Sequence, residues 1–528
     1  MNVAVIGSGP SGLASSEALL ARGIRVTIFD IGEVLPREVQ DRARRLASLP
    51  VANWTKSDRA AMTANSTLRR AIPRKFLFGH EFAYGHDKPY LPLDIKNDHF
   101  APSVAQGGYS TLWGAASLPV AECDMTGWPF GADELTPYYR KILTRMPLVG
   151  GEGTINEVYP FHTDHLGNLP KNRQAKYLLD DLRASERSLD KTHFVYGESR
   201  LAVSSSRCDP CGLCLSGCPR GAIFRTDQVL QSYIETGKIS YRRGILVDEV
   251  DENGSKATLR YTDLNSGTSQ SDHFDAIFIA AGVLGSSRIL LRSKRVYDRS
   301  LRALQSGKFL IPILRRHATS APWEEPSIAL PQIFMEYKIP GFADNWFHVQ
   351  VSSASAMMLE ALGMRPGQER YWKRKLAEPF LSRLMIAWCG MHSDHSTDIA
   401  ISLEHKNGCS STPLLKVRSV GPDRSKKTAK LAGKALFRHG LKFNSWFVTP
   451  AMRLSQPGTG YHCGGTFPHE TERSSEFGTD ILGRPFNWTR VFLVDGSVLP
   501  SIPGNTLALT IMANAMRIAD KAPIGRNG

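Results

Sequence analysis

Residues 3–12 read Val-Ala-Val-Ile-Gly-Ser-Gly-Pro-Ser-Gly, a short apolar run followed at once by a glycine-rich turn. From Leu13 to Arg22 the apolar residues recur at helical spacing, and Gly23 ends that pattern. A second apolar run from Ile24 to Phe29 follows and is closed by Asp30. Strand, turn, helix and strand in this order predict a parallel βαβ unit at the start of an α/β fold.

The glycine turn has the pattern of a dinucleotide site. Gly7 permits a tight turn, Gly9 lets the backbone approach a pyrophosphate, and Gly12 lets the helix pack against the strand. Ser11 lies at the N-terminus of that helix, where free amide groups attract phosphate. Asp30, about twenty residues further on, can accept hydrogen bonds from a ribose diol. We therefore predict a bound dinucleotide here rather than an ordinary βα connection.

Size and charge restrict the class of protein. The chain has 528 residues, of which 42% are hydrophobic and 22% charged, as in an ordinary globular protein of several domains. The net charge of +15 is spread along the chain, and no nucleic-acid-binding signature accompanies it. We interpret it as a solvated basic surface. No apolar stretch is long enough to span a bilayer, and the first strand begins without a signal peptide, so we expect a cytoplasmic protein.

Four of the eight cysteines are grouped in one stretch. Cys208, Cys211, Cys214 and Cys218 have the spacing C-x2-C-x2-C-x3-C and precede a proline, which resembles a bacterial ferredoxin motif. In two-cluster ferredoxins the last cysteine binds the other cluster, and this chain has one such motif. Three alternatives stay open: a 4Fe–4S cluster that takes electrons from a reduced cofactor, a structural zinc, and a loop without metal.

Further segments contain glycine turns and strands. A run from Gln106 to Ala115 contains Gly107, Gly108, Ser110, Trp113 and Gly114. Predicted strands cover Ile239–Glu249, Lys256–Thr262 and His273–Ile279, and a predicted helix covers Val283–Leu291 after Ala281 and Gly282. A basic, aromatic stretch from Arg365 to Trp388 places Leu376, Phe380, Leu384 and Ile386 on one side. We expect it to form a surface helix over the core rather than a membrane-binding helix.

The tail has a second set of motifs. Tyr461-His462-Cys463-Gly464-Gly465-Thr466 is a glycine-rich loop with one histidine. A predicted strand, Val491–Val494, ends at Asp495, and an apolar helix is predicted from Thr506 to Asp520, with Asn505 as its N-cap. Such a helix directs its positive end toward whatever lies before it.

Taken together, the glycine turn, residues 107–115, residues 275–291 and residues 461–520 resemble the glucose–methanol–choline (GMC) oxidoreductases. The resemblance implies FAD at the first turn, with His462 as the catalytic base and Asn505 as the second polar group on the substrate hydroxyl. A neutral imidazole suits removal of a hydroxyl proton near neutral pH. The chain departs from the family where Thr506 replaces a common proline and Trp113 replaces a common asparagine. The implied cofactor-binding residues are Gly7, Gly9, Ser11, Gly12, Asp30, Gly107, Gly108, Ser110, Trp113, Gly114, Val247, Ala281, Gly282, Asp495, Asn505 and Thr506.

The expected architecture is α/β, a doubly wound, Rossmann-like FAD domain with an inserted α+β antiparallel-sheet substrate domain. Residues 1–150, 206–295 and 451–528 are assigned to the FAD-binding domain. Of these, 206–295 also hold the cysteine-rich loop and 451–528 the catalytic loop. Residues 151–205 are assigned as a connecting segment and 296–450 as the substrate-binding domain.

The implied function is oxidation of the CH–OH group of an alcohol, sugar or polyol by hydride transfer to flavin. The electrons then go to an external acceptor, through a 4Fe–4S cluster if the cysteine motif holds one. Two alternatives are an oxygen-dependent alcohol oxidase without a cluster and a non-catalytic flavin-binding electron-transfer protein. We expect a small-molecule substrate, an external electron acceptor and no nucleic-acid partner, and contact with a membrane surface is the less favoured alternative.

Overall fold

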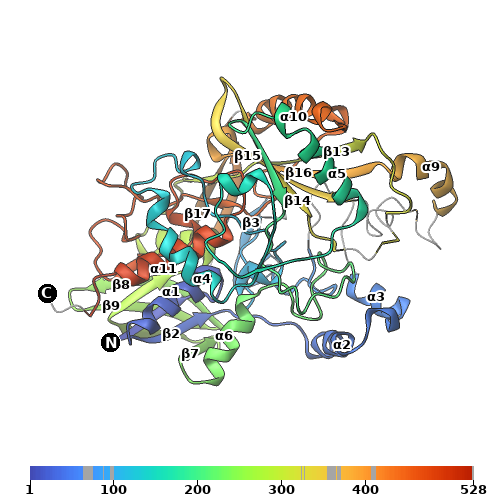
Figure 1. Ribbon diagram of the computed structural model, residues 1–528. Coiled ribbons are helices and arrows are strands. Elements are labelled where there is room, and N and C mark those ends of the chain that lie inside the picture. Colours follow the sequence, from blue (N-terminus) through green and yellow to red (C-terminus); the bar gives the residue numbers. More distant parts are fainter. Residues whose placement is uncertain are drawn as a thin grey trace.

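The computed structural model describes the chain except residues 64–74, 87, 96–99, 323, 326–327, 354–363, 365–369, 406–411, 422 and 526–528. Figure 1 shows two main bodies of secondary structure, a lower one that contains both termini and an upper one formed by long antiparallel strands. Among the helices of the described ranges, none is long and apolar enough to cross a membrane.

A five-stranded parallel sheet forms the lower body. Its strand order is β22-β11-β1-β2-β7, and every neighbouring pair is parallel. Because the carboxyl ends of parallel strands meet at one edge, the residues that follow these strands gather there, although they come from distant parts of the chain. The strands are β1 (Asn2–Ile6), β2 (Arg25–Asp30), β7 (Ile239–Arg243), β11 (Ala276–Ile279) and β22 (Val491–Leu493).

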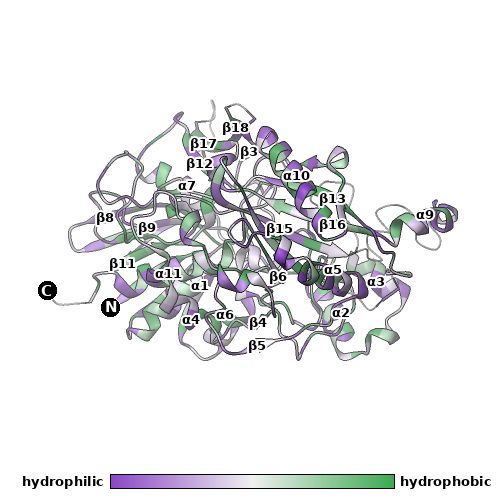
Figure 2. Cartoon of the chain, turned by 45° about the horizontal axis from the view of Figure 1, so that its top comes forward, coloured by the Kyte–Doolittle hydropathy of each residue, from purple (hydrophilic) through white to green (hydrophobic). Residues whose placement is uncertain are grey.

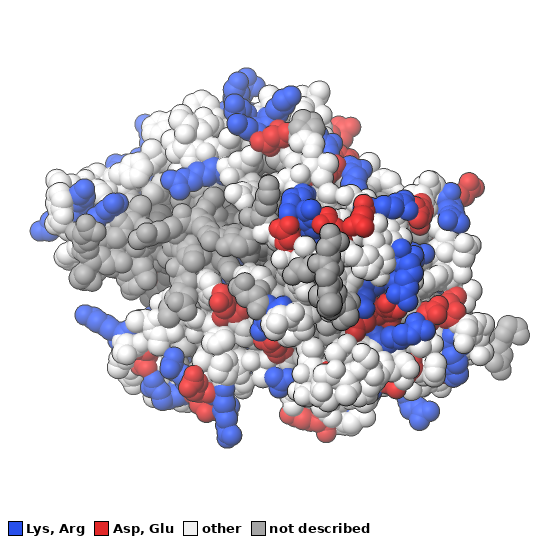
Figure 3. Space-filling model, turned by 180° about the vertical axis from the view of Figure 1, so that it is seen from behind, with Lys and Arg blue, Asp and Glu red and all other residues white. Residues whose placement is uncertain are grey.

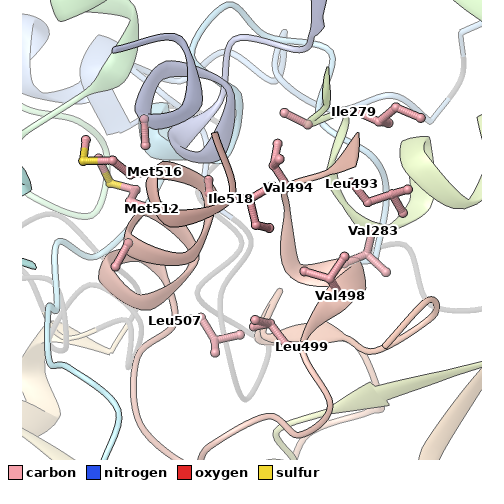
Figure 4. Packing of buried hydrophobic residues seen from close by; sticks show 14 of the residues in the cluster. Ile279, Val283, Leu493, Val494, Val498, Leu499, Leu507, Met512, Met516 and Ile518 are labelled. Carbon is pink, nitrogen blue, oxygen red and sulfur yellow. The ribbon is translucent and has the colours of Figure 1, made fainter. Parts of the chain in front are cut away.

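Apolar helices cover this sheet. Helix α1 (Pro10–Ala21) packs against the C-terminal helix α11 (Ala508–Lys521), while α7 (Gly282–Ser293) follows β11. Figure 4 shows Ile518 of α11 beside Val494, which directly follows β22, and both side chains are fully buried. This packing fixes the tail of the chain to the sheet that begins at residue 2. Beside it lies a three-stranded antiparallel sheet of β8 (Ile245–Asn253), β9 (Lys256–Asp263) and β10 (Ser269–Phe274).

An antiparallel sheet forms most of the upper body, with the order β19-β13-β16-β15-β14-β6 and β20 paired to β13. Helices α5 (Arg173–Ala184) and α10 (Arg424–Lys442) lie against it (Figure 1). Helix α10 alternates hydrophobic and hydrophilic residues around its axis (Figure 2), so that Ala429 and Leu436 are buried while Lys430 is exposed. The strands are β6 (Phe194–Glu198), β13 (Lys308–Arg315), β14 (Ile333–Ile339), β15 (Ala343–Ser353), β16 (Leu384–Gly390), β19 (Ser445–Phe447) and β20 (Arg453–Leu454).

A further mixed sheet has the order β21-β12-β17-β18-β3. Its strands are β3 (Leu93–Ile95), β12 (Leu301–Gln305), β17 (Asp398–Glu404), β18 (Leu414–Val420) and β21 (Cys463–Gly464). Strand β21 pairs with β12 and directly follows His462, so this sheet fixes the end of the histidine loop. The predicted combination of a Rossmann-like sheet and an antiparallel substrate sheet is confirmed.

Several predicted boundaries differ from the structure. The predicted strand from Ile239 to Glu249 is two strands, β7 and β8, because the backbone turns at Gly244 with φ +78° and the two halves join different sheets. The predicted strand from His273 to Ile279 is likewise divided between β10 and β11. Strand β6 comes from the segment predicted to be a connection and pairs with β14.

The basic, aromatic stretch was predicted as one helix, and this is wrong for its second half. Helix α9 (Arg374–Leu381) ends after Pro379, and Leu384 and Ile386 belong to strand β16. The first residues of the stretch lie largely outside the described ranges. Basic and acidic side chains are interspersed over much of the face drawn in Figure 3, in line with a solvated charged surface.

Candidate active site

A cavity of about 880 Å³ opens between the carboxyl edge of the parallel sheet and the antiparallel sheet. Its lining combines the turn after β1 with side chains of β13, β15 and β16 and with the loop before β21. A cavity of this size at such an edge is typical of a cofactor and small-molecule site in α/β proteins.

The first turn has the backbone that a pyrophosphate requires. Gly7 has φ +95°, and an added Cβ would lie 2.6 Å from the Ala280 carbonyl oxygen. A Cβ on Gly12 would lie 2.0 Å from the carbonyl oxygen of Gly7, so the helix packs against the turn only without a side chain there. The N-cap of α1, Gly9, has no side-chain cap, which leaves the first amide groups of the helix available to an anion.

Asp30 lies at the end of β2 in the same cavity. Its carboxylate accepts hydrogen bonds from the Ser8 hydroxyl and, at 3.1 Å, from the Tyr241 hydroxyl. Burial raises the pKa of Asp30 to about 6, and these hydrogen bonds oppose the rise. The Ser8 hydroxyl oxygen also accepts from the Gly107 amide at 2.8 Å, which joins the second glycine segment to the first turn.

Most of the predicted cofactor residues line this cavity. Three of them do not line it. Gly12 and Gly107 lie in the backbone packing next to the cavity, and the Asn505 side chain is directed toward the Pro119 carbonyl instead. Trp113 lines the cavity and donates its indole N–H to the Phe224 carbonyl at 2.7 Å. The predicted residues found in the lining are Gly7, Gly9, Ser11, Asp30, Gly108, Ser110, Trp113, Gly114, Val247, Ala281, Gly282, Asp495 and Thr506.

His462 also lines the cavity, on the loop that leads into β21. Its Nδ1 atom is buried and has no hydrogen-bond partner among the described residues. Burial holds the pKa of His462 well below its usual range, and the charges of Lys308 and His348 lower it further. The imidazole is therefore neutral near pH 7, the protonation state required of a proton acceptor.

The structure does not bring the Asn505 side chain into the cavity. Its amide group donates to the Pro119 carbonyl at 3.2 Å, and the residue is 1% exposed. Thr506 lines the cavity instead, and its hydroxyl oxygen accepts from the Leu118 amide at 2.9 Å. The backbone of Asn505 lies within hydrogen-bonding reach of His462, and a catalytic pairing of the two side chains stays a prediction.

Sequence reasoning missed a row of polar residues across the antiparallel sheet. Glu336, His348, Gly390 and Lys308 are in register on β14, β15, β16 and β13. The His348 Nδ1 atom pairs with the fully buried Glu336 carboxyl group, while Lys308 and His348 both line the cavity.

Gly390 lets this row pack closely against the loop that contains Gly504. A Cβ on Gly390 would lie 2.6 Å from the Lys308 Nζ and 2.2 Å from the Gly504 carbonyl oxygen. The ammonium group of Lys308 occupies that space and donates to the Ser306 hydroxyl at 2.9 Å and to the Gly504 carbonyl at 3.1 Å. Burial lowers the pKa of Lys308 to about 7, and the Glu336 charge opposes this. In the sequence, this polar row is indicated only by a single lysine on the cavity face of a strand with alternating residues.

The cysteine motif forms a loop beside the cavity: Leu215 of this loop lines the cavity, whereas the four cysteines do not. Among the described residues, no three His, Cys, Asp or Glu side chains are grouped as ligands of a metal ion, and all four cysteines of the motif are free. Burial raises the pKa of Cys214 and of Cys208, and neighbouring thiols of the motif raise both further. The described residues thus give no support for a 4Fe–4S cluster or a zinc ion at this motif.

Comparisons with known proteins agree with the fold. No family model matches the chain. A curated relative, 6'''-hydroxyparomomycin C oxidase from Streptomyces lividus, is 22% identical over 544 residues, which cover 98% of this chain and 90% of the relative. The crystal structure of pyridoxine 4-oxidase from Mesorbium loti matches with a TM-score of 0.59 at 14% identity, over 98% of both chains. Over nearly its whole length the chain is thus similar to one curated oxidase and shares the fold of a second oxidase.

Proposed function

We propose that the chain is an FAD-dependent alcohol oxidase in which His462 accepts the hydroxyl proton of the substrate. The observation that carries this proposal is that one cavity joins the glycine turn after β1 to the neutral imidazole of His462. GMC oxidoreductases depend on FAD, and the uncapped α1 N-terminus, the bare turn at Gly7 and the carboxylate of Asp30 fit its pyrophosphate and ribose.

When bound, FAD supplies a two-electron acceptor for the hydride of the substrate C–H bond. The chain's own residues prepare the substrate. His462 takes the proton of the hydroxyl group, so that the carbon–oxygen bond becomes a carbonyl as the hydride leaves. Thr506 and Lys308, in the same cavity, supply polar contacts for the substrate oxygen. The apolar walls of β13 and β16 exclude water from the reacting atoms.

We propose dioxygen as the electron acceptor. Both relatives carry the names of oxidases, and the thiols of residues 208–218 are not arranged around a metal. The second candidate is the dehydrogenase predicted from the cysteine spacing, with a cluster that carries the electrons away.

One experiment separates these two candidates. The protein is purified anaerobically, its flavin, iron and acid-labile sulfide are measured, and a panel of alcohols is then offered in air. The oxidase proposal predicts one FAD per chain, no stoichiometric iron or sulfide, and one hydrogen peroxide for each carbonyl formed. About four irons per chain, with carbonyl formed only when an artificial acceptor is added, would support the dehydrogenase instead.

A further inference from the structure

The side of the cavity that faces the antiparallel sheet is apolar. Strands β13 and β16 contribute alternate residues to it, because side chains on one face of a strand recur every second position. The neutral polar groups here are the side chains of Gln350, Ser352 and Ser353 on β15. The apolar residues on this side are Leu310, Pro312, Phe380, Leu384, Ile386 and Trp388.

Positive charge accompanies this apolar wall. Lys308 lies beside His462, and Arg453 on β20 lines the cavity while remaining exposed to solvent, which places it toward the opening. Arginine keeps its charge at every accessible pH. An alcohol that binds at His462 therefore occupies a cavity that these two basic side chains help to line.

Among the described residues that line the cavity, none on the side of the antiparallel sheet carries a carboxylate. The lining contains Asp30 and Asp495, which both belong to the edge of the parallel sheet. Asp495 accepts from the Ser286 hydroxyl and, at 2.9 Å, from the Ser497 amide, just as Asp30 is engaged by Ser8 and Tyr241. The carboxyl group of Glu336 is fully buried behind His348 and is not part of the lining. No described acid is thus placed to neutralise a cationic substrate.

From this lining we infer that the substrate is an alcohol with an apolar body and no positive charge, and that Lys308 and Arg453 exclude alcohols that carry ammonium groups. The inference rests on the proposed function and adds the substrate class to it. Like charges repel strongly where water is excluded, and a substrate ammonium group would lose its hydration without gaining a carboxylate partner. An anionic or neutral alcohol avoids both this repulsion and the uncompensated loss of hydration of a cationic group.

The direct test compares three 4-substituted benzyl alcohols on the wild-type holoenzyme. The substituents are tert-butyl, trimethylammonio and sulfonate; the first two have nearly the same shape, and the ammonium charge does not titrate. Turnover is followed as peroxide formation. Binding is measured separately from the flavin absorbance change with the α,α-dimethyl counterparts, which lack the hydrogen to be removed.

The expected result is that the tert-butyl and sulfonate compounds bind at least tenfold more tightly than the trimethylammonio compound. Equal binding of all three, tighter binding of the cation, or no binding by any of them would overturn the inference. If the expected binding order is found but no alcohol yields peroxide or reduces the flavin, the proposed function fails while the charge preference of the cavity stands. The two failures are therefore distinguishable.

Variants identify the source of the preference. We expect a smaller ratio between the affinities for the tert-butyl and trimethylammonio compounds in Arg453→Met, at an exposed position, and in Lys308→Met. The control is Lys430→Met, which removes the same charge from an exposed position on α10, away from the cavity, and should leave this ratio unchanged. If Lys308→Met fails to fold with flavin, Arg453→Met carries the test alone. An unchanged ratio in Arg453→Met and in a folded Lys308→Met would overturn the assignment.

The pH dependence adds a readout that a purely structural lysine would not change. Because the pKa of Lys308 is about 7, discrimination against the cation should be greater at pH 6 than at pH 8.5. The difference should disappear in Lys308→Met, and a difference that persists there would assign it to another group and contradict the role of the lysine. The titratable groups that face Lys308 are Glu336, His348, Cys389 and His462.

Discussion

Lys308 and His348 lie in register on either side of Gly390, so that a cation and an imidazole flank the one position in the row that has no side chain. The gap admits the Gly504 carbonyl, and the Lys308 ammonium group donates to that carbonyl at 3.1 Å. The antiparallel sheet is thereby tied to the loop that enters α11 on the other body of the protein. This arrangement places positive charge beside His462 without a direct bond to it.

The first prediction concerns that charge. Lys308→Met should raise the pKa of His462, because a positive charge that opposes protonation of the imidazole is removed while burial remains. The wild-type imidazole stays neutral down to a pH well below its usual pKa, so kcat/KM should have no histidine limb near neutral pH. In the variant that limb should move to higher pH in a pH profile of kcat/KM. A limb that stays fixed or moves to lower pH would contradict the electrostatic role.

The second prediction concerns the first turn. Gly12→Ala places a Cβ 2.0 Å from the Gly7 carbonyl oxygen, so the helix must move away from the turn and the pyrophosphate site must open. The purified variant should lose most of its bound FAD, as measured by absorbance after gel filtration. Gly433→Ala on α10 serves as the matched control, since its Cβ meets only ordinary contacts at 3.4 Å or more. Full flavin content in Gly12→Ala would show that the cofactor lies elsewhere.

The dinucleotide turn and His462 could both be predicted from the sequence. The dinucleotide turn is encoded in consecutive residues, because the backbone angles of Gly7 and the spacing to Asp30 are local properties. His462 could be recognised for a similar reason, as the one histidine of a glycine-rich loop ahead of the strand, Asp495 and the apolar helix of the tail. The loop fixes the position of His462 locally, and the pairing of β21 with β12 holds the end of this loop in place.

Lys308 and His348 could not be predicted in this way. Their proximity depends on the order of β13, β16 and β15 in a sheet, and that order arises from the packing of segments far apart in the chain. The orientation of Asn505 is also a tertiary property. Gly504 is enclosed by the carbonyl groups of Trp346 and Gly390, at 2.8 and 3.0 Å from an added Cβ, and this turns the next side chain into the core.

The third prediction separates structure from chemistry at Asn505. Asn505→Ala removes the hydrogen bond to the Pro119 carbonyl and should lower the free energy of unfolding by about 1–3 kcal/mol. The kcat of the folded, flavin-loaded variant should stay within about threefold of wild type, since the side chain is outside the cavity lining. Chemical denaturation and steady-state assays give the two values. A large fall in kcat with unchanged stability would restore the catalytic role predicted from the sequence.

The fourth prediction concerns the cysteine motif. Because the thiols are outside the cavity and not grouped around a metal, the double variant Cys211→Ser, Cys214→Ser should keep its FAD and form peroxide at a rate close to wild type. Thermal unfolding monitors any loss of packing by the partly buried loop. Loss of a broad visible absorbance together with loss of activity would show that the motif carries electrons.

The proposed reaction depends most on His462 as the proton acceptor. In anaerobic stopped-flow experiments with the fastest of the benzyl alcohols, we expect His462→Gln, loaded with FAD, to show a flavin reduction rate lower than wild type by roughly 10²–10⁴. Binding of the α,α-dimethyl analogue should change far less. Reduction of the flavin in His462→Gln at the wild-type rate would contradict the assignment of this imidazole as the base.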